Sequence, residues 1–310
     1  MGTTRAVARG EAGYLARLAE LDRPPERIFL EGPWDHGGPM VAIVGARDAT
    51  GDGIDLAHDM AAAVSAMGVA VISGLAMGID AAAHRGALMA GGRTGAVLGT
   101  PLSCVYPVAH RDLQRDVARS LGLLTELDGF ASATRSSFAS RNRLLAALAD
   151  AVVVVQGRAG SGTLLTVAAA RALGRPVGVV PWDPREPMAD VPLSLLHAGH
   201  ASVIRHAGDI VALLAAAGAR PPAGAESPAP AAPPGGSADA TSPSSTAAAR
   251  LGAEEAVMLA ALRRRAEPLE VAANRAGLSI AAAGAALVSL ELSGCAERLP
   301  GGAVRRARGR

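Results

Sequence analysis

Two short segments pair glycine with a group that can hold a phosphate. Gly45 and Arg47 follow a run of apolar residues, and Ser73 and Gly74 follow the next such run. Glycine lets a ligand approach the backbone closely, and a guanidinium can grip a phosphate with two hydrogen bonds. Both turns therefore suit an anionic ligand. The alternative for Arg47 is a surface ion pair.

A third segment combines an aromatic ring with cations. Phe138 is one of only three Phe in the chain, and Arg141, Asn142 and Arg143 follow it closely. Single-stranded nucleic acids are bound by aromatic rings that stack on bases and by cations that track the backbone. The segment therefore suits a single strand. A core Phe beside a solvated Arg face would give the same pattern.

A fourth segment, residues 157–163, leads from an apolar run into a predicted helix, and its candidate site residues are Gly160, Ser161, Gly162 and Thr163. Free backbone N–H groups at a helix start, together with two hydroxyls, form an anion site. The spacing matches neither a Walker A loop nor G-x-G-x-x-G. The segment therefore predicts phosphate binding, with a merely tight turn as the alternative.

Catalytic and metal chemistry find little support in the residue pattern. Ser73 lacks the flanking glycines of a hydrolase nucleophile elbow, since Val71 and Leu75 occupy those places. Asp80 and His84 share a helical face but have no third metal ligand, so we expect Asp80 to cap its helix and His84 to be hydrogen-bonded within it. The two cysteines are far apart and lie in no zinc-ligand pattern. We expect no catalytic residue, no metal and no cofactor.

The elements that would position these residues alternate between strand and helix. Short continuous apolar runs indicate buried strands, here expected at residues 40–44, 69–72, 94–98, 122–125, 151–155, 177–180 and 202–204. Helical spacing predicts helices at residues 54–67, 79–90, 111–120, 140–149, 161–173 and 209–216. This order predicts an α/β fold with a Rossmann-like, mostly parallel sheet and helices on both faces. In such sheets ligands bind beyond the carboxyl ends of the strands.

The chain divides into four predicted parts. Residues 1–39 show little pattern apart from one short helical spacing, and residues 40–218 form the α/β domain. Residues 219–250 hold seven prolines among Ala, Gly and Ser, which predicts a disordered linker. Residues 251–307 read as three helices and a β-hairpin around residues 300–302, which is the pattern of a small winged-helix domain.

Composition limits the class of protein. The net charge of +2 permits a nucleic-acid partner without requiring one, and all positive side chains are Arg. No apolar run approaches the roughly 18 residues that a membrane span requires, and no signal-peptide pattern is present. We expect a cytoplasmic protein without membrane contact.

Taken in order, these segments resemble the DNA-processing A (DprA/Smf) family over roughly residues 14–306. The family's V-G-[SA]-R motif is matched at residues 44–47 and its S-G-x-A-x-G-I-D-x-x-A-H stretch at residues 73–84. Its A-V-L-G and Y-P motifs fall within residues 96–107. The F-x-x-R-N-R-x-x-A block spans residues 138–146, and the S-G-[ST]-L-x-T turn spans residues 161–166.

The resemblance implies a non-enzymatic role. Such proteins bind and protect incoming single-stranded DNA during natural transformation, load the RecA recombinase onto it, and dimerise through the Rossmann-like domain. Residues 1–39 would be a remnant of the helical domain that often precedes it. Carried over residue by residue, the DNA site comprises Gly45, Arg47, Ser73, Gly74, Phe138, Arg141, Asn142 and Arg143 with the turn at residues 160–163.

Some positions depart from the family pattern. Met77 stands where the family usually has Arg, Gln156 where an acidic residue is common, and Trp182 where Gly is usual. Because one phosphate contact is lost at Met77, DNA affinity and RecA loading are the properties that these departures put in question.

Two other functions remain open. One is a nucleotide-sensing regulator that reads duplex DNA with helix 279–291, although its alanines offer few groups that read base edges. The other is an enzyme of the phosphoribohydrolase type, whose Glu would fall on Thr166. A binding assay with single strands, duplex and nucleotide competitors separates the three.

Overall fold

The computed structural model describes residues 4–35, 37–219, 253–263, 267–292, 295–299 and 303–307. The chain forms two compact units, residues 1–230 and residues 231–310. In the described residues, no helix is both long and apolar enough to cross a membrane.

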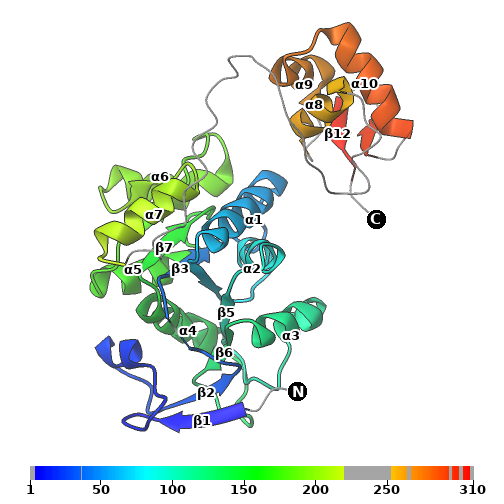
Figure 1. Cartoon of the computed structure of the whole chain (residues 1–310). Helices are drawn as coiled ribbons and strands as arrows, with labels where there is room; N and C mark the ends of the chain where they lie inside the picture. Colours follow the sequence, from blue (N-terminus) through cyan, green and yellow to red (C-terminus); the bar gives the residue numbers. More distant parts are fainter. Residues whose placement is uncertain are drawn as a thin grey trace. The chain divides into compact units, whose positions relative to one another are not determined.

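The first unit contains a nine-stranded sheet in the order β1-β2-β6-β5-β4-β3-β7-β8-β9 (Figure 1). Strands β3 to β9 run parallel, whereas β1 and β2 pair antiparallel with each other and β2 pairs antiparallel with β6. The strands are β1 Thr4–Ala8, β2 Arg27–Glu31, β3 Met40–Val44, β4 Ala70–Ser73, β5 Thr94–Val97, β6 Gly122–Thr125, β7 Ala151–Val154, β8 Val177–Val179 and β9 Ser202–Val203. The predicted parallel sheet is thereby confirmed.

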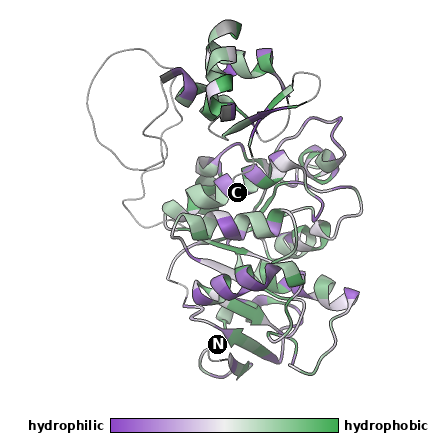
Figure 2. Cartoon of the chain, turned by 90° about the vertical axis from the view of Figure 1, so that its right-hand side faces the viewer, coloured by the Kyte–Doolittle hydropathy of each residue, from purple (hydrophilic) through white to green (hydrophobic). Residues whose placement is uncertain are grey.

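Helices cover both faces of this sheet. Met60 of α1, Ala83 of α2 and Leu214 of α7 belong to one core cluster, whereas Leu144 of α4 and Val167 of α5 belong to another. The helices are α1 Gly51–Ala66, α2 Ile79–Met89, α3 Arg111–Arg119, α4 Arg135–Leu148, α5 Thr163–Ala172, α6 Asp190–His197 and α7 Ala207–Ala216. Short 3-10 helices lie at η1 Ala16–Glu20, η2 Val108–His110 and η3 Pro187–Ala189. Figure 2 shows helices that carry both hydrophilic and hydrophobic residues, as expected for elements with one buried face.

The prediction for residues 1–39 is wrong, because this segment is not separate from the α/β domain. Its strands β1 and β2 extend the sheet beyond β6, and its Leu18, Ile28 and Leu30 are fully or almost fully buried in the main core. The alternating burial of Ile28 and Leu30 along β2 is the period of two that marks a half-buried strand.

The sequence analysis also did not predict the helix α6 and the 3-10 helix η3.

The second unit has the predicted winged-helix elements. Helices α8 Ala253–Ala261, α9 Leu269–Ala276 and α10 Ile280–Leu292 accompany a three-stranded sheet in the order β10-β12-β11. The strands are β10 Glu267–Pro268, β11 Ala296–Arg298 and β12 Ala303–Arg306. The Ser279 Oγ accepts a hydrogen bond from the N–H of Ala282 at 3.2 Å, as an N-cap does. The predicted linker lies outside the described residues from residue 220 on.

Candidate nucleic-acid interface

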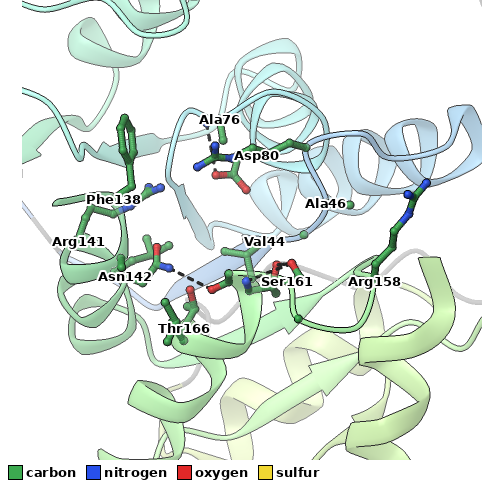
Figure 3. A pocket seen from close by; sticks show the side chains of 18 of the residues that line it. Val44, Ala46, Ala76, Asp80, Phe138, Arg141, Asn142, Arg158, Ser161 and Thr166 are labelled. Atoms are coloured by element: carbon green, nitrogen blue, oxygen red, sulfur yellow. Dashed lines mark hydrogen bonds between the residues drawn. The ribbon is translucent and has the colours of Figure 1, made fainter. Parts of the chain in front are cut away.

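A pocket of about 510 Å³ lies at the carboxyl ends of β3 and β7 (Figure 3). Three segments line most of it: the loop that follows β3, the first half of α4, and the turn that leads into α5. Parallel strands bring their carboxyl ends to the same edge, so turns that are more than 100 residues apart in sequence meet here. The edge that the sequence predicted therefore carries a cavity.

Nine of the twelve predicted site residues line this pocket. They are Gly45, Arg47, Phe138, Arg141, Asn142, Gly160, Ser161, Gly162 and Thr163. Ser73, Gly74 and Arg143 do not line it.

Arg47 and Phe138 form the most distinctive contact of the pocket. The Arg47 guanidinium carbon lies over the Phe138 ring, 5.6 Å from its centroid, within the range of a cation–π interaction. Arg47 is exposed and forms no ion pair within the described residues, and its neighbour Asp48 pairs with Arg158 at 3.4 Å. The surface ion-pair alternative for Arg47 therefore finds no partner in this part of the chain.

Arg141 belongs to the wall of the pocket. It is only 5% exposed, and its Nη1 donates a hydrogen bond to the Val97 carbonyl at 2.7 Å. Its charge is opposed by the buried Asp80, whose pKa is raised by burial and held back by the nearby Arg141 guanidinium. Asp80 in turn accepts hydrogen bonds from the N–H groups of Gly74 at 3.2 Å and Ala76 at 3.4 Å. Asp80 thus holds the loop after β4, and the Arg141 side chain from α4 packs against that loop at Gly74.

Asp80 and His84 do not have the roles expected from the sequence. The N-cap of α2 is Gly78 and no side chain hydrogen-bonds there, so Asp80 does not cap its helix. Asp80 instead ties down the loop that leads into α2, as described above. His84 bonds to β5 and not within its own helix: its Nδ1 lies 2.7 Å from Thr94 Oγ1, which donates to the Val71 carbonyl. The Nδ1 of His84 must therefore carry the proton, and burial lowers the pKa of His84 to about 3. In the described part of the chain, no cluster of three or more His, Cys, Asp or Glu could hold a metal ion.

Ser73 and Arg143 are engaged elsewhere. Ser73 is fully buried, and its Oγ donates to the Ile43 carbonyl at 2.7 Å, which joins β4 to β3. Arg143 pairs with Glu126 and donates from Nη1 to the Arg23 carbonyl at 2.9 Å. On a helix, residues 138, 141, 142 and 145 share one side, whereas residue 143 is rotated away from them. The helical period therefore separates Arg143 from its neighbours in sequence.

The turn before α5 is held in place by α4. The Asn142 Nδ2 donates to the Gly162 carbonyl at 3.2 Å, and the Ser161 Oγ lies 3.0 Å from Thr163 Oγ1. The Thr163 N–H also donates to Ser161 Oγ at 3.3 Å. Gly160 has φ +74°, a conformation that favours glycine. Asn142 thus positions the turn, and part of its donor capacity is already used internally.

Two pocket cations were missed, Arg135 and Arg158. Arg158 stands inside the turn between Gly157 and Gly160, so its position could have indicated it. Arg135 was missed because helix α4 was predicted to begin at residue 140. The signal was a capping box, in which Thr134 Oγ1 accepts from the Ser137 N–H and Ser137 Oγ accepts from the Thr134 N–H.

Two departures from the family pattern have local roles. The Gln156 side chain bonds twice to Thr50, accepting from its N–H at 3.0 Å and donating to its Oγ1 at 2.8 Å, which secures the start of α1. Trp182 donates from Nε1 to the Val155 carbonyl at 2.6 Å. Both side chains therefore reinforce the edge of the sheet that bears the pocket.

Comparison with known proteins extends the likeness over both units. Residues 5–215 match the family described as DNA recombination-mediator protein A, and residues 242–302 match the DprA winged helix domain. Protein Smf of Synechocystis sp. is 36% identical over 208 residues, which make up 66% of this chain and 52% of that protein. The chain spans about half the length of the Synechocystis and Mycobacterium tuberculosis relatives that it matches.

Solved structures share the fold. The X-ray structure of DNA processing protein A from Streptococcus pneumoniae has a TM-score of 0.64 at 30% identity, covering 68% of this chain and 74% of that one. That of DNA processing protein A from Helicobacter pylori has a TM-score of 0.61 at 24% identity, covering 70% of this chain and 99% of that one. Because the first family match covers more than half of the 310 residues, this chain belongs to the DNA recombination-mediator protein A (DprA/Smf) family.

Proposed function

We propose that the pocket at the carboxyl ends of β3 and β7 binds single-stranded DNA. The observation that carries this proposal is the contact between Arg47 and Phe138, which joins a cation to a half-buried ring at 5.6 Å. A nucleobase can stack on the ring while the guanidinium holds the adjoining phosphate, and this combination is how proteins bind single strands without reading their sequence.

The charges around the pocket support an anionic ligand. Four Arg side chains line it, at positions 47, 135, 141 and 158, against two carboxylates, Asp48 and Asp80. Arg141 offsets Asp80 and Arg158 pairs with Asp48. Arg47 and Arg135 then give the pocket its net positive charge, and both are exposed at its mouth.

A single strand fits this site better than a duplex. A base must leave its stack to lie on Phe138, and a duplex keeps its base faces covered. In the second unit, Ile280, Ala285 and Val288 are the exposed side chains described on α10. They carry no hydrogen-bonding group that could read a base edge, which weighs against the duplex-reading regulator.

Family membership supports the wider role. A single-stranded-DNA-binding mode is described for the Helicobacter pylori relative. We extend this to the present chain as a non-enzymatic protein of the cytoplasm that protects incoming DNA during transformation and loads RecA onto it, acting as a homodimer through the first unit. These roles need no resident cofactor.

The nucleotide alternatives have one specific observation each. A pocket of about 510 Å³ is large enough for a mononucleotide, which keeps a nucleotide-sensing role testable. The phosphoribohydrolase alternative is weakened because Thr166, which lines the pocket and is 2% exposed, supplies a hydroxyl where that enzyme class needs a carboxylate.

The test is fluorescence anisotropy with labelled oligo-dT and with duplex of equal length, over a range of salt concentrations and with mononucleotide competitors. We expect single strands to bind more tightly than duplex and nucleotides to compete poorly. Residues 1–219 alone should retain this affinity, because the whole pocket lies within that part. A folded 1–219 fragment without affinity for single strands would refute the site, and efficient competition by a mononucleotide would favour the sensor.

A further inference from the structure

Tyr106 is an exposed aromatic residue beside the pocket. It lies in the loop between β5 and η2, and 51% of it is exposed. The chain has only seven aromatic residues. Three of them, Tyr14, Trp34 and Trp182, have wholly or partly buried rings whose polar ends donate hydrogen bonds to backbone carbonyls. The acceptors are the carbonyls of Pro25, Leu123 and Val155, respectively. Tyr106 makes no such bond within the described residues, so neither burial nor hydrogen bonding explains its ring.

The Tyr106 ring extends the aromatic surface of the pocket. Its centroid lies 5.3 Å from that of Phe138, and the two ring planes are tilted by 50°. Phe138 is itself beneath the Arg47 guanidinium. A line of Arg47, Phe138 and Tyr106 therefore leads from the pocket onto the loop after β5.

Hydrogen bonds hold the loop that carries Tyr106 in place on both sides of this residue. The Ser137 Oγ donates to the Gly99 carbonyl at 2.8 Å, and the Gln114 Nε2 donates to that of Leu102 at 3.3 Å. On the far side of Tyr106, His110 Nδ1 lies 3.0 Å from the Leu75 carbonyl. A ring held in place before binding loses little conformational freedom when a ligand arrives, which favours affinity.

We propose that Tyr106 is a second base-stacking position, on which the nucleobase next to the one on Phe138 lies. This inference rests on the proposed function. In stacked DNA the neighbouring bases are parallel and about 3.4 Å apart along one strand, whereas the planes of the two rings are tilted by 50°. Bases seated on both tilted rings are therefore unstacked from each other, which only a single strand allows. The contact is with base faces, so it accepts any base and adds no phosphate contact.

The experiment compares Tyr106→Ala and Tyr106→Phe with the wild-type chain, using oligo-dT and an oligomer of the same length made of abasic nucleotides. The matched control is Met89→Ala, which removes an exposed apolar side chain from the carboxyl end of α2, whereas the amino-terminal end of this helix lies at the pocket. Because stacking on one ring is sequence-tolerant and substantial, Tyr106→Ala should weaken oligo-dT binding by roughly ten- to a hundredfold. Tyr106→Phe and Met89→Ala should bind as the wild type does.

The abasic oligomer separates stacking from a structural role. It has the same phosphates and no bases, so wild type and Tyr106→Ala should bind it equally, and the salt dependence of oligo-dT binding should be unchanged. An equal loss of affinity for both oligomers would overturn the inference, since Tyr106 would then act by supporting the loop. If Tyr106→Ala bound oligo-dT as tightly as the wild type does, the stacking role of Tyr106 would be overturned but the proposed function would stand. If the wild-type chain bound no single strand, the proposed function would be overturned as well.

Discussion

The Arg141 guanidinium fills the space in which a side chain at position 74 would lie. A Cβ atom placed on Gly74 would be 1.6 Å from Nη1 of Arg141, and that Nη1 donates to the Val97 carbonyl. The N–H of Gly74 is meanwhile bound by Asp80. The turn after β4 and the helix α4, almost 70 residues apart, are therefore one structural unit, and glycine is needed where they meet.

We expect Gly74→Ala to lower the free energy of unfolding of the first unit by about 3 kcal/mol. The new methyl group must displace the buried Arg141 guanidinium from the Val97 carbonyl, which would also weaken its attraction to the buried Asp80. Disrupting the attraction between buried charges costs about this much. Urea titration followed by tryptophan fluorescence measures it, because Trp34 and Trp182 both lie in the first unit.

The control for this substitution is Gly51→Ala at the start of α1, where a Cβ would meet nothing within 4 Å. It should change stability by less than about 1 kcal/mol. If the two variants were equally stable, Arg141 would have room to move, and its fixed position would not be part of the site.

His84 should make stability depend on pH. Burial lowers the pKa of His84 to about 3 in the folded chain, whereas the ordinary pKa of a histidine side chain is 6.5. Between these values the unfolded chain binds the proton and the folded chain does not, so this contribution to stability falls as the pH falls from 6.5 towards 3. The slope is at most about 1.4 kcal/mol per pH unit.

His84→Gln isolates this contribution, because glutamine does not titrate. We expect the wild type to be the more stable at pH 7.5 and its advantage to shrink steadily as the pH is lowered, in urea titrations of both proteins at each pH. Parallel stability profiles for the two proteins would show that His84 is not the group responsible.

The sequence predicted the framework of the site well, because parallel strands are continuous apolar runs. The strands at residues 40–44 and 122–125 were predicted with the observed bounds, and each bound of the other parallel strands differed by at most one residue. The strand β2 was missed for the opposite reason. Only its Ile28 and Leu30 are buried, and the preceding Pro24 and Pro25 suggested a break.

Within the site, the types of residue could be predicted from the sequence, but the direction in which each side chain points could not. Arg141 and Arg143 have the same side chain two positions apart, yet one lies in the pocket wall and the other pairs with Glu126. Their separation depends on where α4 begins and on what packs against each face. The buried role of Ser73 likewise depends on the pairing of β4 with β3, which spacing along the chain does not reveal.

Arg47 should dominate the electrostatic part of DNA binding. We expect Arg47→Ala to weaken binding of oligo-dT by about 1–3 kcal/mol, the value of a hydrogen bond to a charged group. It should also reduce the slope of log affinity against log salt by about one phosphate contact. Anisotropy titrations at several salt concentrations give both quantities.

Arg143→Ala is the matched control, since it removes the same charge from the same edge but from outside the pocket. Its salt slope should equal that of the wild type, although loss of the bond to the Arg23 carbonyl should lower its stability. A reduced slope for Arg143→Ala and an unchanged one for Arg47→Ala would place the DNA on the other side of α4.

Met77→Arg should strengthen binding. Met77 is 56% exposed in the loop before α2, next to Ala76, which lines the pocket. An exposed position accepts a guanidinium without the cost of burying a charge, so the melting temperature should stay the same. The added cation would stand where a backbone phosphate passes, so affinity for oligo-dT should rise and depend more steeply on salt, as one more counterion is released.

The control is Met89→Arg, which adds the same charge at the far end of α2, at a residue that is 69% exposed. If both variants gain affinity equally, the effect is that of net charge alone; a gain confined to Met77→Arg locates the strand beside the loop after β4.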